Sequence, residues 1–186
     1  MIYDKKPRKI HSTKFVDRVV QRAMCDNGLL EDIRRPLVYE NGACLEGKGF
    51  TFAFKLVEKH LRQFYFKSNY RSNIGWYVKI DVKKFFDSTP HSVLKSVVKK
   101  TVKDSWMLER VWEIIDSVED PRPSTEILKD PFGSRGVVLG SQISQLLQLL
   151  VLDKLDHAVK QRFRVKHYVR YMDDMLMLVK TKDEAA

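Results

Sequence analysis

The clearest pattern in the chain is a pair of apolar, β-prone runs near its end, with two acidic residues between them. Residues 165–172 read VKHYVRYM and residues 175–179 read MLMLV. Two such runs separated by two turn-forming residues predict a β-hairpin with Asp173 and Asp174 as its turn. Aspartate tolerates the positive φ that a tight turn requires. A solvated surface hairpin is the simplest alternative, but the flanking runs are too apolar for one.

A second strand is predicted at residues 76–82, which read WYVKIDV and place Asp81 at the strand end. Close carboxylates repel one another and resist ionising together, and a divalent cation is the simplest way to neutralise them. Taken alone, Asp81 is more typical of a turn or a helix cap. Its combination with Asp173 and Asp174 favours a role as a metal ligand.

Helical spacing of apolar residues predicts most of the remaining elements. The first helix is expected to begin after a cap at Ser12 or Thr13 and to end at Asn27-Gly28, and the third after a cap at Ser88 or Thr89. The expected helices cover about 13–24, 51–67, 91–102, 105–118 and 141–162. Residues 120–130 contain two prolines and are expected to form a loop.

The last predicted helix carries a narrow polar stripe, Gln142, Gln145 and Gln148, among leucines. Two interpretations fit this stripe. It caps the edge of the core, or it offers amide groups to a bound strand. Gly136 and Gly140, which precede the helix, would let backbone approach a ligand closely.

Composition narrows the class of protein. The chain has 186 residues, 44% of them hydrophobic, which is enough for one domain or two small lobes. Lys and Arg number 34 against 24 Asp and Glu, giving a net charge of +10. This excess favours a polyanionic partner, most simply nucleic acid, over charge that serves only solubility.

Cysteine usage and hydropathy indicate the compartment. Cys25 and Cys44 lack the spacing of a metal site and are expected to be free thiols in a reducing environment. The charged amino terminus has no apolar signal segment. The longest apolar stretch, residues 146–152, is too short to cross a bilayer. These features predict a soluble, cytoplasmic protein without a membrane partner.

Three segments resemble motifs A, B and C of reverse transcriptases in order and spacing. They are Asp81-x-x-x-Phe85-Phe86, Gly140-Ser141-x-x-Ser144-Gln145 and Tyr171-Met172-Asp173-Asp174. Residues 7–10, 17–21 and 47–49 resemble the finger motifs of bacterial members of the group II intron, retron and diversity-generating types. The resemblance implies an α+β fold with the fingers and palm of a right-hand polymerase, an antiparallel palm sheet backed by helices, and no thumb.

The same resemblance implies a division of the chain. The first part of the fingers would cover 1–75, a palm strand with motif A 76–90, a helical insertion 91–135, and the palm with motifs B and C 136–186. The family's motif D lysine, primer grip and thumb have no counterpart in the sequence. We therefore expect a fingers–palm fragment that is incomplete for activity.

The implied function is RNA-directed DNA polymerisation, in which dNTPs are transferred onto a primer 3′-OH with two Mg²⁺ ions, or Mn²⁺ in their place. The implied partners are an RNA template, a DNA or RNA primer and dNTPs, with room for an accessory protein or a dedicated structured RNA. By matching position, the catalytic and metal-binding residues would be Asp81, Asp173, Asp174 and the Val82 carbonyl. The dNTP would be bound by Arg8, Lys9, Phe86, Leu139 and Gly140, and the template and primer by Lys48, Ser141, Gln142, Gln145, Tyr171 and Met172.

Two positions refine this expectation. Phe86 stands where the family has a bulky gate against the ribose 2′-OH, and RNA-copying RNA polymerases usually have aspartate there. Phe86 therefore favours deoxynucleotides, unless Phe85 and Phe86 both belong to the core. An extended segment is expected here, which would send the two rings to opposite faces, so at most one of them should be fully buried. Leu139, together with Ser144-Gln145 where the family has Ser-Pro, is most similar to the diversity-generating subgroup. The alternative function is a non-catalytic RNA-binding module of the same fold, whose expected signature is a broken acid set.

Overall fold

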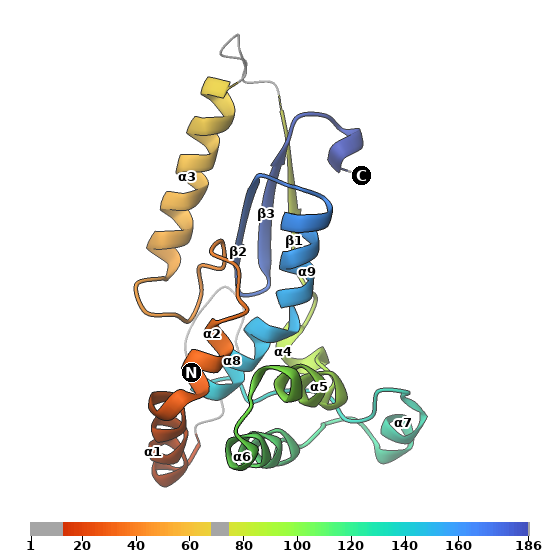
Figure 1. Ribbon diagram of the computed structural model, residues 1–186. Coiled ribbons are helices and arrows are strands. Elements are labelled where there is room, and N and C mark those ends of the chain that lie inside the picture. Colours follow the sequence, from red (N-terminus) through yellow and green to blue (C-terminus); the bar gives the residue numbers. More distant parts are fainter. Residues whose placement is uncertain (1–12, 68–74, 186) are drawn as a thin grey trace. The chain divides into compact units, whose positions relative to one another are not determined.

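The structure, a computed structural model, describes residues 13–67 and 75–185 (Figure 1). The chain folds into two compact units, each assembled from segments that are distant in the sequence. The first contains residues 13–36 and 84–151, and the second contains residues 37–67, 75–83 and 152–185. Within these ranges, no helix has both the length and the apolar character needed to cross a membrane.

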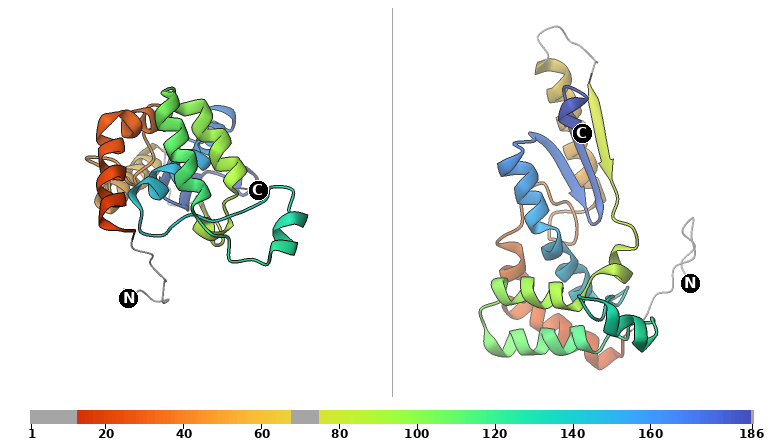
Figure 2. Two further views of the ribbon diagram at one scale, coloured as in Figure 1. Left: turned by 90° about the horizontal axis from the view of Figure 1, so that it is seen from below. Right: turned by 90° about the vertical axis from the view of Figure 1, so that its right-hand side faces the viewer.

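The first unit is helical. Its elements are α1 (Phe15–Met24), α2 (Leu30–Arg34), α4 (Phe85–Ser88), α5 (His91–Thr101), α6 (Ser105–Asp116), α7 (Ser124–Lys129) and α8 (Gln142–Val151). Helices α5 and α6 lie side by side (Figure 2), and α8 packs against α5, α2 and α1. All but two of the α8 side chains from Gln142 to Leu150 are buried, as expected for a helix surrounded by core.

Helix α1 differs from the prediction in its cap and in its apolar face. The residue before the helix is Lys14, which makes no side-chain capping bond, so Thr13 is not the cap. Ser12, the other predicted cap, lies outside the described residues. The predicted break at Asn27-Gly28 is confirmed, because Gly28 has φ 121° in the kinked turn Cys25–Leu29. Phe15 of the predicted apolar face is 71% exposed, so periodicity alone did not identify the buried side.

The start of α5 also corrects a predicted cap. Pro90 precedes the helix, and no side chain caps it. Thr89 Oγ1 instead donates to the carbonyl oxygen of Phe85 at 2.6 Å and lies 3.1 Å from Gln148 Oε1. Gln148 is fully buried, so this member of the glutamine stripe serves the core. Phe85 and Phe86 lie in one helical turn, α4, and not in the extended segment that was expected.

A network of two arginines and two aspartates orders residues 120–135. The sequence predicted a loop at residues 120–130, but this segment contains α7. Arg122 bonds Asp120 through Nη2 at 2.6 Å and Asp130 through Nη1 at 2.8 Å. Arg135 Nε donates to the same Asp130 at 2.6 Å. These guanidinium groups hold the pKa of both carboxyl groups well below its usual range. Charge pairing thus replaces apolar packing in the folding of this segment.

The second unit contains a three-stranded antiparallel sheet in the order β1-β3-β2 (Figure 1). Its strands are β1 (Trp76–Ile80), β2 (His167–Tyr171) and β3 (Asp174–Val179). Ile80 pairs with Met175 across β1 and β3, and Tyr171 pairs with Asp174 across β2 and β3. The predicted strand before Asp81 and the predicted hairpin are therefore both confirmed.

Helices cover both faces of this sheet, as the alternation of side chains along a strand requires. Val169 packs with Ala53 and Leu56 of α3 (Phe50–Lys67), whose buried positions recur at helical spacing. On the opposite face, Tyr168 and Met175 pack with Val159. The expected palm-like sheet backed by helices is present.

The long helix predicted over residues 141–162 is divided. It consists of α8, then α9 (Asp153–His157), then a π-helical turn, Ala158–Arg162. The interruption lies at Leu152, which is also the position at which the chain passes from the first unit to the second. Apolar periodicity continues through this point, so the sequence pattern gave no sign of the interruption.

A buried histidine links α3 to β2. The ring of His60 lies 5.2 Å from the ring of His167 between centroids, in an edge-on arrangement. Burial lowers the pKa of His60 to about 4, with smaller contributions from the charges of His167 and Lys160. Within the described part of the chain, His60 Nδ1 has no hydrogen-bond partner. The folded state therefore favours the neutral imidazole.

This pKa predicts how stability depends on pH. Between about pH 4 and pH 6.5 the unfolded chain binds more protons at this residue than the folded chain, so the free energy of unfolding should fall as the pH falls through that range. His60→Leu should flatten the dependence, measured as the urea midpoint at several pH values. Arg62→Gln, an exposed change on the same helix, should keep the wild-type slope. An unchanged slope in the His60 variant would contradict the prediction.

Candidate active site

The acidic hairpin turn has a different register from the predicted one. Tyr171 and Asp174 form the last pair of the β2–β3 ladder, so the two turn residues are Met172 and Asp173. Asp174 is the first residue of β3. The positive φ of the turn, 55°, belongs to Met172 and not to an aspartate. A left-handed conformation is unfavourable for a residue with a long side chain, so contacts outside the turn must support it.

The β1–β3 register places the third acid beside this turn. Asp81 follows directly after Ile80, whose partner on β3 is Met175. Continued by one residue, the same register sets Asp81 opposite Asp174. The ammonium group of Lys79, two residues earlier on β1, lies 3.1 Å from a carboxylate oxygen of Asp174. Both side chains of this pair are more than half exposed, so the pair adds little to stability.

The donors at this edge of the sheet fit a hard divalent cation in kind, because Mg²⁺ prefers carboxylate oxygens. Asp81 is exposed and Asp173 is half-buried. In the parts of the chain that the structure describes, no three His, Cys, Asp or Glu side chains are gathered as one metal site. Val82 is half-buried, and its side chain packs beside Tyr168 and Met175. The three predicted acidic ligands thus lie at the neighbouring ends of β1 and β3 and in the turn before β3. One of them, Asp174, is paired with Lys79.

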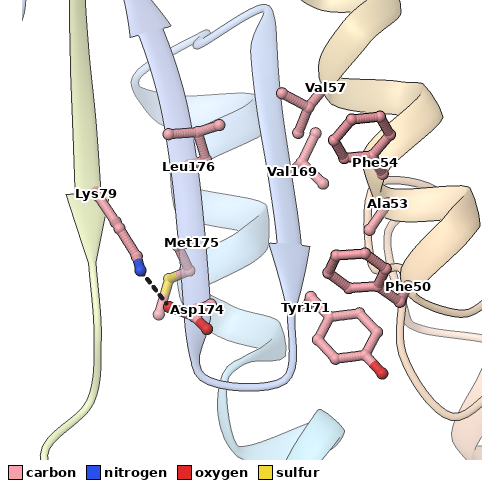
Figure 3. Close-up of a pocket in the computed structure, with 10 residues that line it drawn as sticks. All are labelled: Phe50, Ala53, Phe54, Val57, Lys79, Val169, Tyr171, Asp174, Met175 and Leu176. Carbon is pink, nitrogen blue, oxygen red and sulfur yellow. Dashed lines mark ion pairs between the residues drawn. The ribbon is translucent and has the colours of Figure 1, made fainter.

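An apolar pocket of about 250 Å³ adjoins the acidic turn (Figure 3). Phe50, Phe54 and Val57 of α3 form one side, and Tyr171 and Leu176 of the sheet form another. The ring of Phe50 meets the ring of Tyr171 edge-on, with centroids 6.1 Å apart. Lys79 and Asp174 lie at the sheet side of this pocket. An aromatic surface next to a pair of opposite charges suits a ligand with both a ring and an ionic group.

Sequence reasoning missed the contribution of α3 to this site. Phe54 was predicted only as part of an amphipathic helix, Phe50 lay just before that predicted helix, and Lys79 was predicted only as a strand residue. The signals were available for both. Phe50 and Phe54 are four residues apart, so they share a helix face. Lys79 is two residues from Asp81, so the two share a strand face.

The motif B residues lie in the first unit. Gly140 has φ 116°, a conformation that favours glycine. The buried hydroxyl of Ser141 donates to Gln21 Oε1 at 2.9 Å, which joins this loop to α1. A second pocket, of about 330 Å³, opens beside this bond and includes Asp17 and Glu113. Ser141 therefore has a structural partner in addition to its predicted role.

The other predicted contacts are distributed along the first unit. Gln142 is exposed, Gln145 is half-buried, and Leu139 is half-buried. Phe86 is half-buried, while Phe85 is 4% exposed, which confirms that at most one of the two rings belongs fully to the core. Arg8 and Lys9 lie outside the described residues. The roles of these residues in binding dNTP or template stay predictions.

Lys48, predicted to bind template, is engaged within the second unit. Its ammonium group donates to the carbonyl oxygens of Tyr39 and Asn41, both at 2.8 Å. It also lies 5.2 Å from the ring centroids of Tyr39 and Phe52. Burial lowers the pKa of Lys48. The side chain thereby fastens the loop that precedes α3.

Comparison with known proteins identifies the family. A family model described as reverse transcriptase (RNA-dependent DNA polymerase) matches residues 4–186. The chain belongs to the reverse transcriptase family. This membership covers almost the whole sequence and includes all three acids. The expected enzyme class, a reverse transcriptase nucleotidyltransferase, is therefore confirmed at the level of the family.

This reverse transcriptase chain is similar to a curated protein and to solved structures. It is 27% identical over 100 residues to the putative COX1/OXI3 intron 2 protein of Saccharomyces cerevisiae. The aligned stretch covers 51% of this chain and 11% of that protein. Its fold matches that of apo telomerase from Candida tropicalis, in a form that lacks the C-terminal domain. The TM-score is 0.51 at 14% identity, and the match covers 90% of this chain and 34% of the telomerase chain.

A second telomerase, from Candida albicans in complex with a fragment of telomeric RNA, matches with a TM-score of 0.52 at 13% identity, over 90% of this chain and 29% of that one. At such identities the likeness shows the fold alone. The chain spans about a tenth of the curated relative and about a third of these structures. The fingers–palm reverse transcriptase fold is confirmed, while the bacterial subtype is not distinguished.

The contacts of Lys48 predict a structural effect for its removal. Lys48→Met should lower the free energy of unfolding by roughly 1–3 kcal/mol, since two carbonyl oxygens lose a charged donor. Thermal unfolding measures this effect. Lys55→Met, an exposed change on α3, should leave the melting temperature unchanged. If the Lys48→Met variant instead melts like wild type and binds RNA more weakly than the Lys55→Met variant, the template-binding interpretation of Lys48 would be restored.

Proposed function

We propose that this chain provides the fingers–palm active site of an RNA-directed DNA polymerase, which joins dNTPs to a primer 3′-OH along an RNA template. The observation that supports this most directly is the β1–β3 register, which pairs Ile80, the residue before Asp81, with Met175, the residue after Asp174. Family membership over residues 4–186 supports it independently. Phosphoryl transfer needs positioning and charge neutralisation more than covalent chemistry.

Asp81, Asp173 and Asp174 would hold the two divalent cations, Mg²⁺ or Mn²⁺, with the Val82 carbonyl as a further ligand. When bound, such cations neutralise charge on the attacking 3′-oxygen and on the leaving pyrophosphate. The chain itself has to free Asp174 from Lys79, whose ammonium is 3.1 Å away. In this proposal Lys79 balances the charge of Asp174 until substrate and cation arrive together.

The remaining roles follow the family positions. Arg8, Lys9, Phe86, Leu139 and Gly140 would surround the dNTP. Ser141, Gln142, Gln145, Tyr171 and Met172 would contact template and primer. We also propose a bacterial-type member, with the diversity-generating subgroup favoured by Leu139 and by Ser144-Gln145 in place of Ser-Pro. A cytoplasmic location is consistent with two free thiols. The domain limits proposed from the sequence follow this assignment.

One observation favours a second function. Lys79 already neutralises Asp174, so the turn does not require a cation to exist. A reverse transcriptase fold kept as a non-catalytic RNA-binding module would have such a pairing. The retention of all three acids argues for the polymerase, and the variant described next separates the two functions.

Asp173→Asn should abolish primer extension in the complete protein, because it removes one carboxylate charge from the proposed cation site. RNA binding and thermal stability should change little, since the side chain is half-buried at a turn and not in the core. Extension with dNTPs and a labelled primer, together with RNA binding by filter retention, provides the measurement. Asp183→Asn, an exposed acid after β3, is the control. If wild type and Asp173→Asn both bind RNA and neither extends the primer, the RNA-binding module is supported; equal, active extension by both would remove Asp173 from the cation site.

Phe86→Val should raise the use of ribonucleotides relative to deoxynucleotides, because a smaller side chain leaves room for the 2′-OH. Relief of ~1.4 kcal/mol of steric repulsion corresponds to about tenfold in the ratio of kcat/KM values. Phe85→Val, a change at the buried neighbour, should instead lower stability and leave that ratio unchanged. A Phe86 variant that is only less stable would assign this ring to the core.

A further inference from the structure

A fully buried charge pair lies beneath the acidic turn. Both Arg170 on β2 and Asp156 on α9 have 0% of their side chains exposed. Arg170 Nη2 and Nε donate to Asp156 Oδ2 at 2.7 and 2.9 Å, and Nε also lies 2.8 Å from Oδ1. The hydroxyl of Tyr168 donates to Asp156 Oδ1 at 2.5 Å. The carboxylate therefore orients the guanidinium with a rigid, two-pronged contact.

The remaining arm of the guanidinium reaches the turn. Arg170 Nη1 donates to the carbonyl oxygen of Met172 at 2.9 Å. Met172 is the turn residue with φ 55°, and it directly precedes Asp173. A left-handed conformation at such a residue persists only where its surroundings impose it. The bond from Arg170 acts on the peptide unit that joins Met172 to Asp173, so it limits the direction in which the acidic residue can leave the turn.

A neighbouring loop supports the same residues from the side. The backbone N–H of Arg170 donates to the Glu40 carbonyl at 3.1 Å, and the N–H of Gly42 donates to the Arg170 carbonyl at 2.8 Å. The sulfur of Cys44 in the same loop lies 3.5 Å from the sulfur of Met172. Both the main chain of Arg170 and the side chain of Met172 are thereby fixed by one short segment.

Stability alone does not explain a charge pair at this place. When two charges are removed from water, they lose solvation free energy, and their mutual attraction compensates for only part of that loss. Apolar side chains of similar volume are therefore often as stabilising as a buried ion pair. A hydrocarbon at position 170 could fill the space between sheet and α9, but it could not donate a hydrogen bond to the Met172 carbonyl. The guanidinium provides a contact that apolar packing lacks.

We propose that Arg170, oriented by Asp156 and Tyr168, is a positioning residue that fixes the Met172–Asp173 turn and so directs the Asp173 and Asp174 carboxylates toward their cations. The last part of this inference rests on the proposed polymerase function. The first part, the restraint of the turn, is a property of the folded chain. The two parts can be measured separately.

The test removes the whole polar cluster, so that no charge is left unpaired in the core. The triple variant Tyr168→Phe, Asp156→Leu and Arg170→Met replaces it with apolar side chains, and its melting temperature should stay near that of wild type. Amide hydrogen exchange in the peptide containing residues 171–176 should become at least tenfold faster, while exchange in α3 and β1 stays unchanged. Mn²⁺ binding, followed by the EPR signal of the free ion without nucleotide, should weaken at least tenfold.

A matched control removes a buried polar contact elsewhere. Thr89→Val with Gln148→Leu deletes the hydrogen-bonded pair of the first unit, and exchange at residues 171–176 should then remain as in wild type. If the triple variant does not fold, Arg170→Lys takes its place, because lysine keeps the charge but lacks the planar fork that holds Asp156 while reaching Met172. Faster exchange at the turn of a folded Arg170→Lys protein is expected.

The outcomes are distinct. A folded variant with wild-type exchange at residues 171–176 overturns the positioning role. Faster exchange with unchanged Mn²⁺ binding supports the restraint of the turn and overturns its link to the cation site. If wild-type protein fails to extend a primer, the proposed polymerase function is wrong, and the exchange measurement still decides the role of Arg170. In an active protein, the triple variant should lower kcat at least tenfold with less than a threefold change in the KM for dNTP.

Discussion

The buried pairing of Arg170 with Asp156 is the constraint on which the acidic end of the sheet depends. Neither charge could be buried alone, because an unpaired charge in a protein core is strongly destabilising. Helix α9 and strand β2 must therefore assemble together and in one register. The loop at residues 40–44 follows, since its backbone bonds to the main chain of Arg170. The turn, the helix behind the sheet and the loop beside it are thus parts of one polar arrangement.

Much of this arrangement was predictable from local pattern. The apolar, β-prone runs at residues 76–80 and 175–179 are typical of strands, and the spacing of Ala53, Leu56 and His60 predicts a helix face. The turn register was not predictable, since a left-handed Met172 depends on a hydrogen bond from Arg170. Motif residues could be placed at strand ends, yet only the β1–β3 ladder shows that the strand before Asp81 pairs with the strand that Asp174 begins. The ion network of residues 120–135 was missed because proline content indicated a loop and the sequence does not show which of the nearby charges pair.

The basic character of the chain has two physical origins. Some cations belong to the fold: Lys48 bonds two carbonyl oxygens, and Arg122 and Arg135 bond buried carboxylates. Others, such as Lys99 and Lys100 at the end of α5, are exposed and complement the negative end of a helix. The count of 34 Lys and Arg therefore overstates the number of cations available to a nucleic acid. Salt dependence of RNA binding, which counts phosphate contacts, should reflect the exposed subset alone.

Both units are discontinuous in sequence, and this determines the order in which a ribosome can deliver them. The helical unit is complete once residue 151 has been synthesised, whereas the sheet unit still lacks β2, β3 and α9 at that stage. Strand β1 and the apolar side of α3 then remain without their partners until β2 and β3 emerge. Unpaired strand edges and uncovered apolar faces favour aggregation during synthesis. The acidic turn joins the two strands that complete the sheet, so β1 and α3 need chaperone protection until that turn has been synthesised.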